Sequence, residues 1–208
     1  MIGSNHLRYA FSPSADPMPA PTSILYFDLG SPYAYLAVER AVSVFDVPPR
    51  LQPVLLGALF AERGWGSWSA TAERAANIAE VQRRARTYGL PDIEWPDGWP
   101  TNTLTAMRAS IWADRRGVGE AFARAAFRAA FVRGLDLANQ DTLLETGESV
   151  GLVATEMQLA LSDPEVKDAL RTATGEALAA GVRGVPTVRV GERVYYGDER
   201  LEEAAAAA

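Results

Sequence analysis

The fold is decided by the stretch Ile24-Leu25-Tyr26-Phe27-Asp28-Leu29-Gly30-Ser31-Pro32-Tyr33-Ala34. Its first four residues form a short apolar run of strand-favouring side chains, which is typical of a buried β-strand. The serine and proline that follow the glycine are a helix-start signal, with serine at the N-cap and proline at the first helical position. Apolar residues then repeat at helical spacing from Tyr35 to Phe45, until Pro48-Pro49 ends the pattern. The stretch therefore predicts a strand that leads directly into a helix.

Strand patterns recur only near the two ends of the chain. A second strand is predicted at 51–55, and the strand–helix–strand order implies a right-handed parallel crossover. Beyond it the helical patterns fall at 69–88, 102–116, 119–133, 139–149, 153–160 and 163–180. A β-hairpin is predicted from 187–190 and 193–196, and a last helix from 199 to about 207. The layout β-α-β, then helices, then β-β-α predicts an α/β, thioredoxin-like fold with a large all-helical insertion.

This layout divides the chain into three parts. Residues 1–22 are rich in Ser, Pro and small side chains and predict a disordered leader. Residues 23–56 and 182–208 together predict the thioredoxin-like domain, and 57–181 the helical insertion domain. The leader has no signal-peptide pattern, which indicates a cytoplasmic location, and no apolar run reaches the roughly 18 residues of a membrane span.

Composition excludes several classes of function. The formal net charge is −6, so the chain lacks the basic field that binds nucleic acid. It has no cysteine, which removes disulfides, thiolate metal sites and intrinsic thiol–disulfide chemistry. Its one histidine, His6, lies in the leader, so neither a histidine-based triad nor a metal site is expected.

Two motifs face each other in the expected fold. Ser31-Pro32-Tyr33-Ala34 occupies the strand-to-helix junction where redox thioredoxin-fold proteins carry Cys-X-X-Cys, with Ser31 at the first cysteine position. Val185-Pro186 comes just before a strand, where the fold keeps a cis-proline, and the Val185 backbone would then be free to pair with an extended thiol peptide. The alternatives are a plain N-cap at Ser31 and a trans proline that opens an edge strand.

A third motif, Tyr196-Gly197-Asp198-Glu199-Arg200-Leu201, opens the last helix. Its two acids are either an N-cap with a favourable dipole charge or a partner for a ligand ammonium group, beside helix N–H groups that hold a carboxylate.

Taken in order, five segments resemble the 2-hydroxychromene-2-carboxylate isomerase family, close to kappa-class glutathione transferases within the DsbA-like thioredoxin superfamily. The resemblance covers about residues 24–203 and rests on Phe27–Leu36, Pro53–Phe60, Pro100–Leu104, Gly184–Thr187 and Tyr196–Glu202.

The resemblance implies a glutathione-dependent isomerase or kappa-like transferase, with glutathione or another small thiol as cofactor. Ser31 maps to the catalytic serine that stabilises the bound thiolate. The thiol-binding positions are implied at Pro32, Tyr33, Val185, Pro186, Gly197, Asp198 and Glu199. Asn102 lies in the family's Pro-x-Asn-Thr stretch and is expected to face the substrate, a small aromatic or conjugated carbonyl compound. From their own chemistry, the loop residue Trp65 is expected to suit a flat aromatic substrate and Arg183 to meet a substrate carboxylate. The family also implies a homodimer, while the composition predicts no metal, nucleic acid or membrane partner.

The sequence departs from the family pattern at several positions. Trp65 follows Gly64 where an asparagine is frequent, and the usual lysine of the insertion is absent, with Glu73 and Arg74 nearby. Arg183 stands where an aromatic residue is common. These departures leave an alternative open, a redox-inactive DsbA-like protein that binds another small thiol or a peptide.

Overall fold

Four strands form one mixed sheet at the centre of the computed structural model, which describes residues 23–62, 64 and 66–208. The predicted leader, 1–22, and Trp65 lie outside the described residues. The strand order is β2-β1-β3-β4, with bounds Ser23–Phe27 for β1, Arg50–Pro53 for β2, Thr187–Val190 for β3 and Arg193–Tyr196 for β4. β1 pairs with β2 in parallel and with β3 in antiparallel orientation, so the two ends of the chain share one sheet.

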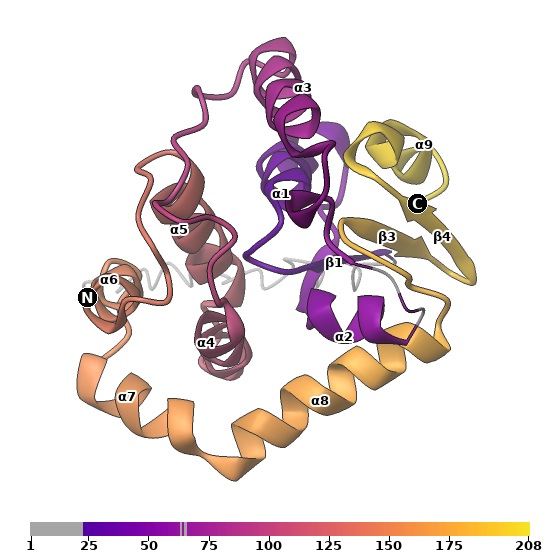
Figure 1. Cartoon of the computed structure of the whole chain (residues 1–208). Coiled ribbons are helices and arrows are strands. Elements are labelled where there is room, and N and C mark those ends of the chain that lie inside the picture. The colour runs from indigo at the N-terminus through magenta and orange to yellow at the C-terminus, as the bar shows by residue number, and fades with distance from the viewer. Residues whose placement is uncertain (1–22, 63, 65) are drawn as a thin grey trace, which may run out of the picture.

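The helices fall into two groups along the chain (Figure 1). The first group comprises α1 Pro32–Val44, α2 Leu56–Ala61, a 3-10 turn Trp68–Ala70 and α3 Arg74–Thr87. The second group, which lies within the predicted insertion 57–181 as α3 also does, comprises α4 Leu104–Arg115, α5 Gly119–Phe131, α6 Gln140–Glu148 and α7 Ala154–Ser162, and α8 Pro164–Ala179 runs back from these helices toward the sheet. The chain closes with a 3-10 turn Asp198–Arg200 and α9 Leu201–Ala205.

A cluster of aromatic rings joins the insertion to the sheet. The ring of Phe27 in β1 lies 5.7 Å from that of Phe127 in α5, and the ring of Tyr35 in α1 lies 5.8 Å from that of Phe131. All four side chains are almost fully buried. Because burial of such rings is the main driving force for packing, α5 is held firmly against α1. The insertion is thereby fixed beside the first turn of α1.

The predicted strand–helix–strand unit, the C-terminal hairpin and the helices of the insertion are confirmed, with ends that shift by a few residues. One boundary is wrong by more: the helix predicted at 69–88 begins only at Arg74. Side chains explain the late start, since Ser67 accepts from the Ser69 N–H and Thr71 from the Glu73 N–H. These local bonds favour turns over helix.

No sequence pattern predicts α2, which begins without a side-chain cap at the preceding residue. Within the described part of the chain, none of the helices has the length and apolar content to cross a bilayer.

Candidate functional site

Ser31 caps the N-terminus of α1 at the point where β1 ends. Its Oγ accepts from the Ala34 N–H at 3.2 Å, and its carbonyl accepts from the Tyr35 N–H. Pro32 occupies the first helical position and lacks the N–H that would otherwise need a partner. The serine is 5% exposed. Since the cap bond uses only the lone pair of Oγ, its O–H proton stays available for a ligand.

A fully buried carboxylate lies behind this turn. Asp28 accepts from the Gly30 N–H at 2.8 Å, from the Thr103 hydroxyl at 2.9 Å and from the Leu56 N–H at 2.9 Å. Burial raises the pKa of the Asp28 carboxyl, and these three bonds oppose part of the rise. Hydrogen bonds to the Asp28 carboxylate therefore hold the turn before Ser31, the start of α2 and the start of α4 close together.

The Val185–Pro186 peptide bond is cis, as the sequence predicted. The Pro186 carbonyl accepts from the Gly197 N–H at 2.9 Å, and the Thr187 hydroxyl donates to the Gly184 carbonyl at 2.8 Å. Among the described residues, the N–H and C=O of Val185 have no backbone or side-chain partner. A free donor and acceptor on one residue are what an extended peptide needs in order to pair.

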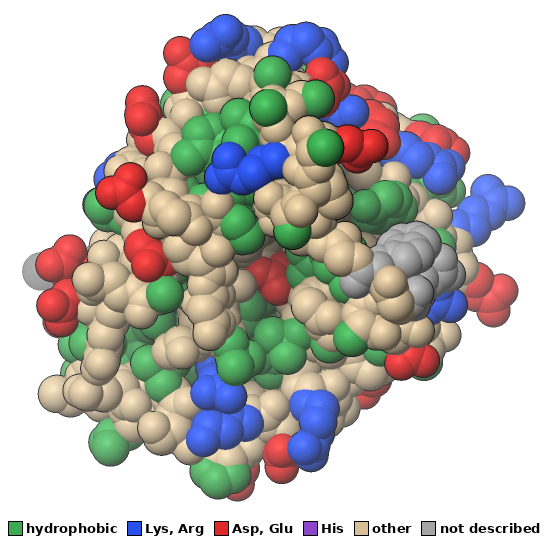
Figure 2. All heavy atoms as spheres, in the orientation of Figure 1, with side chains coloured by type: hydrophobic (Ala, Val, Ile, Leu, Met, Phe, Trp, Pro, Cys, Tyr) green, Lys and Arg blue, Asp and Glu red, His purple; other side chains and the backbone are tan. Residues whose placement is uncertain are grey.

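Ser31 and Val185 line one hollow, which we call the Ser31 cavity, of about 210 Å³. Gly30, Pro32, Tyr33 and Tyr196 complete the wall around them. The lining also includes the apolar side chains of Leu56, Phe60, Trp68 and Trp99 and the polar Ser67 and Asn77. In the orientation of Figure 1, Figure 2 shows one face of the molecule hollowed near its centre, with hydrophobic side chains beside the hollow and an acidic side chain within it.

A smaller hollow, the Arg84 cavity, measures about 130 Å³. It shares three residues with the Ser31 cavity, namely Tyr33, Val185 and Tyr196, and adds Arg84, Pro186, Gly197 and Glu199. The two hollows are therefore neighbours on either side of the same residues. The Ser31 cavity contains the Ser31 hydroxyl, and the Arg84 cavity contains the opposite charges of Arg84 and Glu199.

Arg84 bonds to three acidic residues at the Arg84 cavity. Its Nη1 donates to Asp198 Oδ1 at 2.7 Å and to Glu199 Oε2 at 2.8 Å, and its Nε donates to Glu80. These acids raise the pKa of the guanidinium above its usual range despite partial burial. Burial raises the pKa of Glu199, but its own backbone N–H and Arg84 outweigh that and lower it overall.

Asp198 differs from its neighbour in being completely buried. It accepts from the Tyr88 hydroxyl at 3.0 Å as well as from Arg84, and its carbonyl accepts from Arg40. Burial raises the pKa of Asp198, while Arg84 and Tyr88 lower it. Asp198 lines neither cavity, but its hydrogen bond with Arg84 holds the guanidinium in place.

Aromatic rings form a continuous wall beside Ser31. The ring of Trp68 lies 5.2 Å from that of Trp99, which lies 4.7 Å from that of Trp95. Tyr33 meets Trp68 edge-on at 6.2 Å, and its hydroxyl donates to Asn77 Oδ1 at 3.1 Å. A flat apolar ring can stack against such a wall.

Two of the substrate residues expected from sequence are not brought to the site. Asn102 accepts from the Leu104 N–H through its side chain and so starts α4. Arg183 donates to the Leu178 carbonyl at 2.9 Å and so satisfies the end of α8. Neither lines the Ser31 or the Arg84 cavity, because each satisfies a nearby helix terminus instead. The third, Trp65, lies outside the described residues.

Sequence reasoning missed Asn77, Arg84 and Tyr196, all of which line the site. The first two lie on one face of α3, seven residues apart, and Tyr88 follows four residues later. That helical spacing was a usable signal, since residues so placed share a face.

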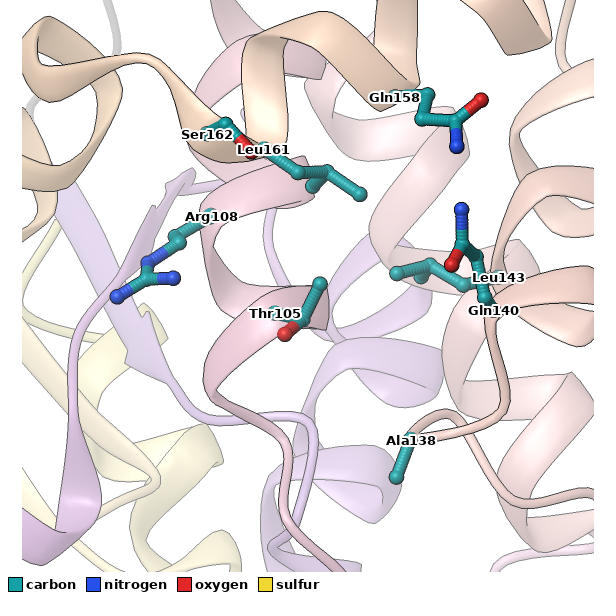
Figure 3. Close-up of a pocket in the computed structure, with 8 residues that line it drawn as sticks. All are labelled: Thr105, Arg108, Ala138, Gln140, Leu143, Gln158, Leu161 and Ser162. Atoms are coloured by element: carbon teal, nitrogen blue, oxygen red, sulfur yellow. The ribbon is translucent and has the colours of Figure 1, made fainter.

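A further hollow of about 350 Å³ lies among α4, α6 and α7. In Figure 3 the amides of Gln140 and Gln158 face each other across it, with Arg108 at the other end. Its lining brings no carboxylate or histidine next to a nucleophile, so we assign it no chemistry. Across the described residues, no cluster of three or more His, Cys, Asp or Glu is placed to hold a metal.

Comparison with known proteins places these features in a family. The model of the DSBA-like thioredoxin domain matches residues 23–207. The chain is 26% identical over 186 residues to 2-hydroxychromene-2-carboxylate isomerase of Sphingobium xenophagum, which covers 85% of this chain and 92% of that one.

Two solved structures share the fold. A 2-hydroxychromene-2-carboxylate isomerase matches with a TM-score of 0.80 at 21% identity, covering 89% of this chain and 93% of that one. The cytosolic disulfide reductase DsbM of Pseudomonas aeruginosa with GSH matches with a TM-score of 0.61 at 18% identity, covering 88% and 94%. The α/β, thioredoxin-like fold expected from the sequence is confirmed.

Proposed function

This chain belongs to the DSBA-like thioredoxin domain family, and from that premise we propose that it is a glutathione-dependent isomerase or a kappa-like transferase. The isomerase relative supports an enzymatic function of the isomerase or thioredoxin type. The absence of cysteine rules out a redox pair within the chain, so the sulfur has to come from a small molecule. When bound, the thiol supplies a nucleophile that adds to a conjugated carbonyl compound and leaves again after rotation.

The residues present fit a γ-glutamyl thiol along its length. The free N–H and C=O of Val185 suit the cysteinyl backbone, which pairs with them as a strand pairs with a sheet edge. Ser31 lies in the same cavity and suits the sulfur. At the far end, Glu199 suits an ammonium group and Arg84 a carboxylate.

Two features of α1 favour the thiolate. A free thiol has a pKa of about 8.5, and a fall of about two units needs about 2.7 kcal/mol of preferential thiolate stabilisation. A hydrogen bond from the Ser31 hydroxyl to a charged group contributes about 1.5–3 kcal/mol. The N-terminus of α1 adds about 0.3–1 kcal/mol. Together they suffice, so Ser31 acts as a hydrogen-bond donor and need not ionise.

The aromatic wall supports the choice of substrate class. Trp68, Trp99 and Phe60 line the Ser31 cavity together with the serine turn. A flat aromatic or conjugated carbonyl compound stacked on them would lie in the same hollow as the Ser31 hydroxyl. The chain thus holds two reactants together and excludes water from part of their surface.

The observation that carries the proposal is that Ser31, at the N-terminus of α1, shares a cavity with the unpartnered backbone of Val185. Thermal unfolding in the presence of glutathione tests it. Because a ligand of the folded state stabilises by RT ln(1 + [L]/Kd), the melting temperature should rise with the logarithm of millimolar glutathione. S-methylglutathione should stabilise less, since it offers no thiolate to Ser31. No rise with either compound would contradict the proposal.

A second candidate function rests on the same free backbone. Val185 can pair with an extended peptide as readily as with a small thiol. A redox-inactive binding protein would be stabilised by thiol peptides and would not turn over a conjugated carbonyl compound. Turnover therefore separates the two functions.

A further inference from the structure

The proposed isomerisation needs a hydrogen-bond donor besides Ser31. When the far alkene carbon of a conjugated carbonyl compound is attacked, the alkene pair moves toward the carbonyl carbon and the carbonyl pair moves onto oxygen. The same pairs return when the attacking group leaves, so the reaction is redox-neutral. Negative charge on that oxygen is costly in a partly dry cavity unless a donor faces it. The Ser31 proton is already directed to sulfur.

Most other donors of the Ser31 cavity are committed. The Tyr33 hydroxyl donates to Asn77, and the hydroxyls of Ser67 and Ser69 bond to each other at 2.6 Å. Asn77 is anchored by Tyr33 and by its own bond to the Glu73 carbonyl. The indole N–H of Trp99 has no partner, but its nitrogen is closed off from the hollow.

Tyr196 and Trp68 are exceptions, because neither the Tyr196 hydroxyl nor the Trp68 indole N–H has a hydrogen-bond partner among the described residues. Tyr196 is 56% exposed although it is a large aromatic residue. It lines both the Ser31 cavity and the Arg84 cavity. The neighbouring tyrosine of β4, Tyr195, points to the other face of the sheet and is buried.

The backbone around Tyr196 fixes where its ring lies. Tyr196 pairs with Thr187 across the hairpin, next to Pro186. Its ring covers Gly184 so closely that a Cβ at Gly184 would lie 2.8 Å from Cε2 and 3.3 Å from the hydroxyl oxygen. The hydroxyl therefore lies beside the segment that presents Val185. Partial desolvation and Glu199 raise the pKa of Tyr196 above its ordinary value of 10.0, so the hydroxyl keeps its proton at neutral pH.

We propose that Tyr196 is a second catalytic residue of this site, whose hydroxyl donates to the carbonyl oxygen of the substrate as that oxygen gains negative charge. The assignment rests on the proposed function for its chemistry, and on the position of the free hydroxyl for its geometry. Ser31, at the start of α1, then donates a hydrogen bond to the thiol sulfur, and Tyr196, in β4, donates one to the carbonyl oxygen of the substrate in the same cavity.

The experiment compares the wild type with Tyr196→Phe, which keeps the ring and removes the hydroxyl, and with Tyr195→Phe as a control outside the cavity. The first readout needs no thiol. Para-nitrophenol is a flat aromatic oxyanion whose protonation is visible by absorbance, and a donor at its oxygen lowers its pKa when bound. The pKa of the bound probe should be lower in the wild type and Tyr195→Phe than in Tyr196→Phe.

The second readout is the rate at which glutathione adds to benzylideneacetone, a conjugated ketone. Removal of one oxyanion donor lowers such rates by about 10²-fold, so Tyr196→Phe should lose about that much while glutathione still raises its melting temperature, because the ring that lines the cavities is kept. If Tyr196→Phe matches the wild type in both readouts, the assignment is overturned and the proposed function stands. If the wild type neither binds glutathione nor adds it, the proposed function fails instead, and an unshifted nitrophenol pKa would then overturn the Tyr196 assignment separately.

Discussion

The guanidinium of Arg84 donates to the carboxylate of Asp198 at 2.7 Å, and these residues lie 114 positions apart in the chain. The pair joins α3 to the segment that follows β4, where the charged end of the site lies. Asp198 has no exposed surface, so Arg84 and Tyr88 replace the water that a carboxylate would otherwise hold. The geometry of the Arg84 cavity thus depends on a buried contact behind its wall.

Arg84→Gln should destabilise the protein, because it leaves the buried Asp198 without its positive partner. The expected loss is about 3 kcal/mol in the free energy of unfolding measured with denaturant. Arg83→Gln is the matched control, since among the described residues the Arg83 side chain pairs with Glu80 alone, at the surface, and its loss should cost at most about 0.5 kcal/mol. Equal losses of unfolding free energy in the two variants would mean that the Arg84–Asp198 pair contributes no more to stability than a surface ion pair.

The raised pKa of Asp28 should make its contribution to stability larger at low pH, whereas most carboxylates stabilise a folded chain more at high pH. Because burial raises its pKa above the ordinary 3.8, the folded chain binds this proton more tightly than the unfolded chain. Its contribution to stability is therefore lost as the pH rises through the folded-state pKa, and is regained as the pH is lowered.

Asp28→Asn removes this titration and isolates it from the other acids of the chain. The difference in unfolding free energy, wild type minus variant, should grow as the pH is lowered from neutral through the folded-state pKa of Asp28. Denaturant curves at several pH values give this difference directly. A difference that shrinks on acidification would show that the ionised carboxylate is the favoured form.

Gly184→Ala should disturb the wall shared by the two cavities. The added Cβ would lie 2.8 Å from Cε2 of Tyr196, so the ring has to move, and overpacking of this kind costs about 1–3 kcal/mol. Adding Tyr196→Ala should relieve the clash, so the double variant should fall short of the sum of the two single losses. Gly175→Ala is the control, because nothing lies near its Cβ position within α8, and it should be neutral or stabilising.

Several features of the fold could be predicted because they depend on neighbouring residues only. Ser31 with Pro32 starts α1 through a bond to Ala34, three residues away. Asp163 with Pro164 starts α8 in the same manner. Gly191 supports the hairpin turn with a φ of 57°, a conformation that favours glycine. In each case the sequence window contains both partners of the interaction.

Other features could not be predicted because one partner lies far along the chain. The first N–H of α2, at Leu56, donates to the Asp28 carboxylate and not to a side chain at the preceding residue. The sequence therefore contains no local N-cap that would predict this helix. Arg84 meets Asp198 only after the chain has folded. Conversely, Asn102 was expected at the site from the resemblance and Arg183 from the affinity of arginine for carboxylates. In the structure, the polar groups of both side chains bond to nearby helix ends instead.

The most direct test of the central claim is the pKa of the thiol of bound glutathione, followed by thiolate absorbance in the wild type and in Ser31→Ala. The wild type should hold this pKa about two units below the free value of about 8.5, and Ser31→Ala should return it most of the way. The cap bond to Ala34 is lost in the variant at a cost of about 1 kcal/mol, so its folding is checked by melting. An identical thiol pKa in the two proteins would contradict the role assigned to Ser31.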